Sequence, residues 1–206
     1  KMLAEMPAEE LVAAMDFHGI RDAIDEAGCL EMLRANDPTR AERIARVERE
    51  GFPAYTTSCG WIGYSDEIIR ARCREALADG FTHFKMKIGQ SIDDDVRRAR
   101  IIRDEIGPKS TLMVDANQRF DVQQAIEWIK PLAPFNIWWF EEPVSPDDVL
   151  GHAEIARAIQ PIRVATGEQC QNRVMFKQFL ASGAMQICQL DACRVGGVND
   201  NLAIMA

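Results

Sequence analysis

From residue 51 onward, the chain alternates between short apolar runs and longer segments whose apolar residues recur every three or four positions. The first pattern predicts buried strands, and the second predicts amphipathic helices. A predicted strand, a polar turn and a predicted helix together form a unit that occurs six times. The strands are expected at residues 53–58, 82–88, 111–116, 137–142, 162–166 and 185–190. The helices are expected at residues 65–79, 92–106, 122–132, 147–159, 172–181 and from 198 onward.

Regular alternation of strands and helices predicts a parallel sheet with crossover helices. Six such units fit both an open doubly wound sheet and a closed barrel. No GxGxxG turn is present, as a nucleotide-binding open sheet would require, whereas charged residues end nearly every strand. We therefore predict an α/β fold of the (β/α)8 TIM-barrel type, with about six of its βα units in this chain.

The first 50 residues differ from the rest because they are rich in helix formers and carry no strand pattern. We predict a helical leader over residues 1–50 and a partial barrel, the catalytic domain, over residues 51–206. The chain starts at Lys1 inside a helical pattern, and residues 202–206 offer neither a capping glycine nor a polar tail. We expect the sequence to be a fragment of a longer protein.

Composition excludes several classes of partner. The chain has 206 residues, 47% of them hydrophobic and 27% charged, which is typical of a soluble globular protein. Its net charge of −8 argues against a nucleic-acid partner. No apolar run is long enough for a membrane span, and no signal peptide opens the chain. Six cysteines without CxxC spacing indicate reduced thiols and a cytoplasmic location.

Charged residues follow the predicted strands at regular intervals. Lys85 and Lys87 close the second strand, Asp115 closes the third, Glu141 closes the fourth, and Glu168 follows the fifth. The steps from Lys87 to Asp115, Glu141 and Glu168 are 28, 26 and 27 residues, or about one βα unit each. Because the active sites of such barrels lie at the carboxyl ends of the strands, these side chains are expected at one level of the barrel.

The negative charges of three neighbouring carboxylates repel one another and require compensation by positive charge. Two unit charges about 4 Å apart repel by roughly 4 kcal/mol at an effective dielectric constant near 20. Oxygen donors on a rigid scaffold suit Mg²⁺ better than zinc, which prefers nitrogen and sulfur. We therefore assign Asp115, Glu141 and Glu168 as ligands of one Mg²⁺. Glu142 is expected to point to the opposite face from Glu141, so only one of the two can be a ligand.

The two lysines suggest the reaction. Lys85 and Lys87 share one face of a strand, because positions i and i+2 point the same way. Two ammonium groups side by side and near a dication are expected to lower each other's pKa, and a lysine with a lowered pKa can accept a proton. A base beside a metal that stabilises an enolate oxygen indicates proton abstraction next to a carboxylate.

These residues together resemble a known family. Its members are similar at Lys85-x-Lys87, Asp115-x-Asn117, Glu141-Glu142-Pro143, Gly167-Glu168 and Asp191. The family is the enolase superfamily, mandelate racemase subgroup, whose lysine base and Mg²⁺ form a recognised pattern. Longer stretches resemble the L-fuconate dehydratases within it, at residues 53–58, 114–120, 141–152 and 172–178.

The resemblance implies an Mg²⁺-dependent dehydratase with a small sugar acid, L-fuconate in first place, as its substrate. The substrate carboxylate would bind Mg²⁺ and Lys85, and Lys87 would remove the C2 proton. Departure of the C3 hydroxyl would then give a 2-keto-3-deoxy acid. By the same resemblance, Asn117 and Glu168 hold substrate-binding positions, and Asp191 is the acid that orients the catalytic histidine.

The chain departs from the family at that histidine, which the family carries on a seventh strand. His18 precedes the barrel, His83 starts a strand and His152 falls on a helix, so none of them can replace it. Most of the family's N-terminal capping domain is also absent. We expect these residues alone to be inactive, and homo-oligomers of the full-length protein remain possible. A racemase, a dehydratase of another aldonate and a truncated non-catalytic protein remain as alternatives.

Overall fold

A computed structural model describes residues 2–206, so Lys1, the first residue of the predicted leader, lies outside the described residues. The chain divides into two compact units. The first, which we call the sheet unit, contains residues 54–167 and 179–189. The second, the helical unit, contains the described residues up to 53 together with residues 168–178 and 190–206.

The helical unit contains the helices expected for the leader. They are α1 (Met2–Glu5), α2 (Ala8–Ala14), α3 (Glu26–Asn36), the short 3₁₀ helix η1 (Asp37–Thr39) and α4 (Arg40–Glu50). The same unit also contains α10 (Val198–Met205), which corresponds to the helix expected from residue 198 onward. The Asp25 side chain accepts a hydrogen bond from Gly28 N (2.8 Å) and so caps α3. The core of the helical unit is a small apolar cluster of Phe17, Ile20, Cys29 and Ala203.

Six parallel strands form the sheet unit, in the order β1-β2-β3-β4-β5-β6. They are β1 (Thr56–Gly60), β2 (His83–Lys87), β3 (Thr111–Asp115), β4 (Ile137–Glu141), β5 (Arg163–Thr166) and β6 (Ile187–Cys188). The crossovers contain α5 (Asp66–Ala78), α6 (Ile92–Ile106), α7 (Val122–Ile129), η2 (Lys130–Phe135) and α8 (Val149–Ala158). Helix α9 (Arg173–Ala181) begins in the helical unit and ends in the sheet unit. The predicted parallel α/β fold is confirmed.

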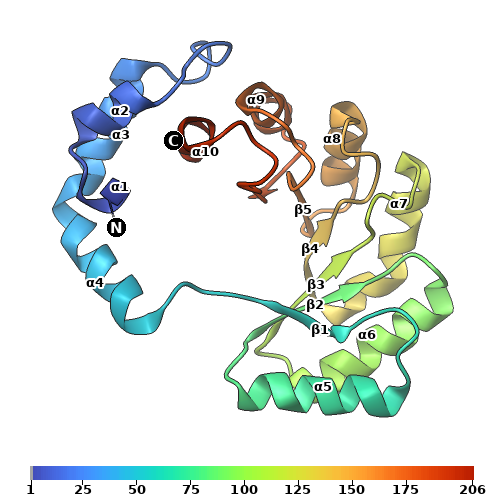
Figure 1. The fold of residues 1–206 in the computed structure, drawn as a ribbon. Coiled ribbons are helices and arrows are strands. Elements are labelled where there is room, and N and C mark those ends of the chain that lie inside the picture. Colours follow the sequence, from blue (N-terminus) through green and yellow to red (C-terminus); the bar gives the residue numbers. More distant parts are fainter. Residues whose placement is uncertain (1) are drawn as a thin grey trace. The chain divides into compact units, whose positions relative to one another are not determined.

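Helices α5 to α8 cover one face of the sheet, and the main core lies between these two layers (Figure 1). Fully buried strand residues such as Phe84, Leu112 and Phe140 belong to this core, together with the helix residues Ile69 and Ile102. On the other face of the sheet, Met113, Trp139 and Ala165 form a second, smaller cluster. None of the described helices is both long enough and apolar enough to cross a membrane.

Two of the predicted strands differ from those observed by more than one residue at an end. The first was expected at residues 53–58, but β1 begins at Thr56, so Tyr55 precedes the strand instead of lying near its end. The sixth was expected to be six residues long, but β6 contains only Ile187 and Cys188. At its start, the Gln186 side-chain oxygen accepts the hydrogen bond of Val164 N (2.9 Å), which a strand carbonyl would otherwise accept.

His152 in α8 is a buried histidine whose protonation we expect to destabilise the fold. Its Nδ1 lies 2.8 Å from the carbonyl oxygen of Asp148, its ring packs edge-on against Phe179, and its Nε2 has no hydrogen-bond partner among the described residues. Burial lowers the pKa of His152, an effect that the contacts with Asp148 only partly oppose. The unfolded chain therefore binds a proton near pH 6.5 that the folded protein does not, so stability falls as the pH drops below this value.

We predict that His152→Asn flattens this dependence. Between pH 8 and pH 5, the free energy of unfolding of the wild type should fall more steeply than that of the variant, with a difference of at most about 1.4 kcal/mol per pH unit for one proton. Urea unfolding of both proteins across this range measures the difference. Parallel pH profiles for the two proteins would exclude His152 as the source.

A candidate active site at the carboxyl ends of the strands

The register of the sheet brings the predicted residues to one level. Lys87 pairs with Asp115 across β2 and β3, and Asp115 pairs with Glu141 across β3 and β4. Each of these residues is the last of its strand. For these three residues, the one-unit spacing in the sequence therefore corresponds to one level in the sheet, as predicted.

Lys85 joins the two carboxylates. Its Nζ lies 2.5 Å from Glu141 Oε1 and 3.3 Å from Asp115 Oδ2. The phenol oxygen of Tyr55 accepts a further hydrogen bond from Lys85 Nζ (3.3 Å). Lys85, Asp115 and Glu141 are each 4% exposed or less. The site is therefore a buried cluster in which one ammonium group bridges two acids.

Lys87 contacts the same aspartate from the neighbouring position. Its Nζ donates to Asp115 Oδ2 (2.5 Å) and to Asn117 Oδ1 (2.7 Å). The lysine pair therefore faces Asp115 together, as the period of the strand predicts. Asn117 reaches Lys87 from outside the strand, because β3 ends at Asp115 and Asn117 has a left-handed backbone (φ 44°) in the following turn. The backbone N–H of Asn117 donates to Asp115 Oδ1 (2.9 Å).

The charges of the cluster shift its protonation equilibria. Burial raises the pKa of Glu141, and the nearby Asp115 carboxylate raises it further, against the opposing effect of Lys85. Burial also disfavours the charged form of Asp115, but Lys87 and Lys85 outweigh it and hold the pKa of Asp115 below its usual range. Burial disfavours the ammonium form of Lys85, yet Glu141 and Asp115 together raise the pKa of Lys85 well above normal. The lowered pKa was expected for lysines beside a dication, so this expectation stays a prediction for the metal-bound protein.

The donor set fits a hard cation. Two buried carboxylates, Asp115 and Glu141, end adjacent strands. Both lie beside the ammonium group of Lys85, so their environment is one that attracts positive charge. The indole Nε1 of Trp139 donates to Glu141 Oε2 (3.2 Å), which is the kind of second hydrogen bond that orients a ligating carboxylate. Within the part of the chain that the structure describes, no group of three or more His, Cys, Asp or Glu side chains forms a complete metal site. The three-carboxylate Mg²⁺ site therefore stays a prediction.

Glu142 follows Glu141 directly but has different partners. Its backbone is left-handed (φ 40°), its side chain is buried, and its Oε1 accepts a hydrogen bond from Gln118 Nε2 (3.1 Å). Glu141 binds Lys85 instead. The two glutamates therefore have different partners, and the assignment of only one of them as a metal ligand stays a prediction.

The other predicted site residues belong to the helical unit. Glu168 comes directly after Gly167, the residue that follows β5, and Asp191 lies in a turn in which its Oδ1 accepts a hydrogen bond from Cys193 N (2.8 Å). The roles of Glu168 and Asp191 stay predictions. In the sheet unit, His83 opens β2 at the end opposite to Lys87, and His152 lies in α8.

Two aromatic residues in contact with the cluster were not predicted as site residues. Tyr55 stacks edge-on against Trp139 with ring centroids 5.7 Å apart, and the two rings contact Lys85 and Glu141 respectively. The signal that could have found Trp139 was its position, because it lies two residues before Glu141 and therefore on the same face of the strand.

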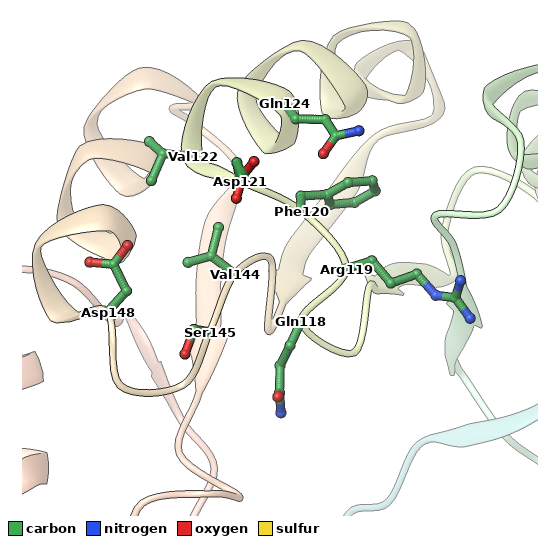
Figure 2. Close-up of a pocket in the computed structure, with 9 residues that line it drawn as sticks. All are labelled: Gln118, Arg119, Phe120, Asp121, Val122, Gln124, Val144, Ser145 and Asp148. Carbon is green, nitrogen blue, oxygen red and sulfur yellow. The ribbon is translucent and has the colours of Figure 1, made fainter.

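The carboxyl ends of the strands also border a pocket of about 430 Å³ (Figure 2). The pocket lies between the turn after β3 and the turn after β4. Figure 2 shows Arg119 and Asp148 on opposite sides of the pocket, with the Arg119 side chain extending away from Asp148. None of the predicted catalytic or metal-binding residues lines it. Gln118 connects the pocket with the cluster, because it lines the former and hydrogen-bonds Glu142 beside the latter. The pocket is therefore adjacent to the candidate site and does not contain it.

Comparison with known proteins identifies similar sequences over the whole chain. Residues 69–206 match the family described as enolase C-terminal domain-like. The chain is 51% identical over 207 residues to human mitochondrial enolase superfamily member 1, covering 100% of this chain and 47% of the human protein. It is 47% identical over 210 residues to L-galactonate dehydratase of Hypocrea jecorina, again covering 100% of this chain and 47% of the relative. The chain thus spans about half the length of these relatives.

Solved structures agree with these matches. The crystal structure of the human protein superposes with a TM-score of 0.95 at 50% identity, covering 99% of this chain and 47% of the human chain. L-talarate dehydratase from Polaromonas sp. JS666, solved with Mg and L-glucarate, superposes with a TM-score of 0.69 at 31% identity. That match covers 73% of this chain and 42% of the dehydratase.

Proposed function

The chain belongs to the enolase superfamily, in its C-terminal domain-like family, and on this premise we propose that the full-length protein is an Mg²⁺-dependent sugar-acid dehydratase. The observation that carries the proposal is the buried cluster of Lys85, Lys87, Asp115 and Glu141 at one level of the sheet. Relatives named as dehydratases of L-galactonate and L-talarate support the class of reaction.

In this proposal, Lys87 is the base that accepts the C2 proton of the substrate. Its Nζ lies at the carboxyl end of β2, where Asp115 and Asn117 fix its position through two hydrogen bonds. Lys85 remains an ammonium group and binds the substrate carboxylate, a role supported by its burial between two acids. Asn117 contacts the substrate in addition to holding Lys87.

A divalent cation held by Asp115, Glu141 and Glu168 would stabilise the negative charge that develops on the substrate carboxylate during the reaction. Loss of the C2 proton to Lys87 and of the C3 hydroxyl, which leaves as water after protonation, gives an enol that rearranges to a 2-keto-3-deoxy acid. We assign that protonation to a histidine outside this chain, oriented by Asp191. Residues 1–206 alone are accordingly proposed to be inactive as a dehydratase.

For the substrate, we propose L-fuconate, with L-galactonate as the closest competitor. The two acids have the same configuration and differ only at C6, where L-galactonate carries a hydroxyl group. A panel of aldonates assayed with the full-length protein tests the proposal, since the rate of keto-acid formation gives a catalytic efficiency for each acid. L-Fuconate is expected to give the highest value. Inversion at C2 without loss of water would instead identify a racemase, and absence of turnover with every acid would refute the dehydratase.

We further propose that the protein is cytoplasmic and acts on a small molecule without a nucleic-acid or membrane partner. The six cysteines, all of which are free thiols, support a reducing compartment. Homo-oligomerisation of the full-length protein is also proposed. Cell fractionation tests the location, and light scattering of the purified full-length protein tests the oligomeric state.

A further inference from the structure

Helix α6 carries a pair of opposite charges, Asp95 and Arg98, that is completely buried. Both residues are 0% exposed, and Arg98 Nη2 donates to Asp95 Oδ1. Removing two charges from water is costly, and the pair's own attraction compensates only when further hydrogen bonds satisfy the remaining donors and acceptors. The other hydrogen bonds of this pair therefore indicate its role.

Those hydrogen bonds lead to the backbone around Lys87. Arg98 Nη2 donates to the carbonyl oxygen of Lys87 (2.8 Å), and Asp95 Oδ2 accepts from the amide of Gly89 (2.8 Å). The two contacts hold the consecutive peptide groups that flank Ile88. Arg98 Nη1 also donates to the carbonyl oxygen of Gly60, at the end of β1 (3.3 Å). We call Asp95 and Arg98 the backbone clamp.

Neighbouring side chains hold the clamp itself in place. Arg98 Nε donates to Asp94 Oδ2 (2.8 Å), and the indole Nε1 of Trp128 in α7 donates to Asp95 Oδ2 (2.9 Å). Two helices therefore fix the clamp against the carboxyl ends of β1 and β2. An apolar pair would fill this space without fixing the direction of a carbonyl group.

The clamp acts on the strand end that carries the candidate base. Lys87 is the last residue of β2, and beyond it Ile88 N continues the ladder by donating to the carbonyl oxygen of Asp115 (2.9 Å). We propose that the backbone clamp is a positioning device for Lys87, which holds its peptide group so that Nζ stays beside Asp115 and within reach of the substrate. This inference rests on the proposed function, because it takes Lys87 as the base.

The test uses the double variant Asp95→Asn/Arg98→Met of the full-length protein, which removes both charges and so leaves neither one buried alone. The first readout is the ¹⁵Nζ resonance of the Lys87 side chain in ¹⁵N-lysine-labelled protein, assigned by its loss in Lys87→Arg. The second is exchange of the substrate C2 proton with solvent, normalised to the folded fraction. We expect the resonance to broaden and the exchange rate to fall about 10- to 100-fold, because displacements of about 1 Å cost on that order, with little change in KM.

Arg103 provides a matched control on the same helix. It donates to the carbonyl oxygens of Gly107 (2.8 Å), Ser110 (2.7 Å) and Phe135 (3.0 Å), at the opposite end of the strands. Arg103→Met should lower stability while leaving the Lys87 resonance and the normalised exchange rate unchanged. A double variant that behaves like this control would overturn the inference. A broadened resonance in a protein whose wild type shows no exchange would support the positioning and refute the dehydratase.

Discussion

Replacing Lys87 by methionine in the full-length protein is expected to abolish exchange of the substrate C2 proton with solvent. Methionine preserves the length of the side chain but cannot accept a proton, and a positioned base contributes about 10²- to 10⁴-fold to such a reaction. Lys85 is not expected to substitute for it, because that ammonium group is buried between Glu141 and Asp115. Incubation with substrate in D₂O, followed by NMR, measures the exchange.

The matched control is Lys109→Met. Lys109 is an exposed lysine between the end of α6 and the start of β3, at the opposite end of the strands from Lys87. This variant should exchange the C2 proton at the wild-type rate. Mg²⁺ binding should be retained in both variants. Exchange that persists in Lys87→Met would assign the base to another residue.

The second large effect concerns the cation. We expect Asp115→Asn, Glu141→Gln and Glu168→Gln each to weaken Mg²⁺ binding by the full-length protein. The loss should be at least the roughly 10- to 100-fold that follows removal of a residue that merely orients a ligand. Each substitution replaces a carboxylate by an amide of the same shape, so the loss reports on charge and not on packing. Isothermal titration calorimetry of each variant measures the dissociation constant.

Glu142→Gln is the matched control, since Glu142 adjoins Glu141 in the sequence, is equally buried and is hydrogen-bonded to Gln118 instead of Lys85. Its Mg²⁺ titration should match that of the wild type. Unchanged titrations in all three carboxylate variants would rule out the proposed site.

The sheet could be predicted because most of its signals are local. Helix α6 was expected over residues 92–106 and has those bounds, since Ser91 accepts a hydrogen bond from Asp94 N (3.4 Å) at its start and Gly107 follows its end. The start of β1 was misplaced because residues 53–55 are as apolar as a strand. The start of β6 was misplaced because the side chain of Gln186 accepts a hydrogen bond from Val164 N across the sheet, and no local pattern records such a contact.

The site was predictable to the extent that parallel strands convert sequence spacing into a shared level. That conversion accounts for Lys87, Asp115 and Glu141, which lie in register. The role of Asp95 and Arg98 was missed, since opposite charges three residues apart on a helix usually indicate a solvated pair. A signal was present nonetheless, because both fall on the same helical face as buried apolar residues of α6 such as Ile102.

The most direct test of the central claim is a crystal structure of the full-length protein in which Mn²⁺ replaces Mg²⁺, so that anomalous scattering locates the ion. The account predicts one ion, with an oxygen of Asp115, of Glu141 and of Glu168 each at about 2.1 Å, and with Lys87 beside it. An ion bound elsewhere, or a Glu168 carboxylate too distant to share the ion with Asp115 and Glu141, would contradict the account.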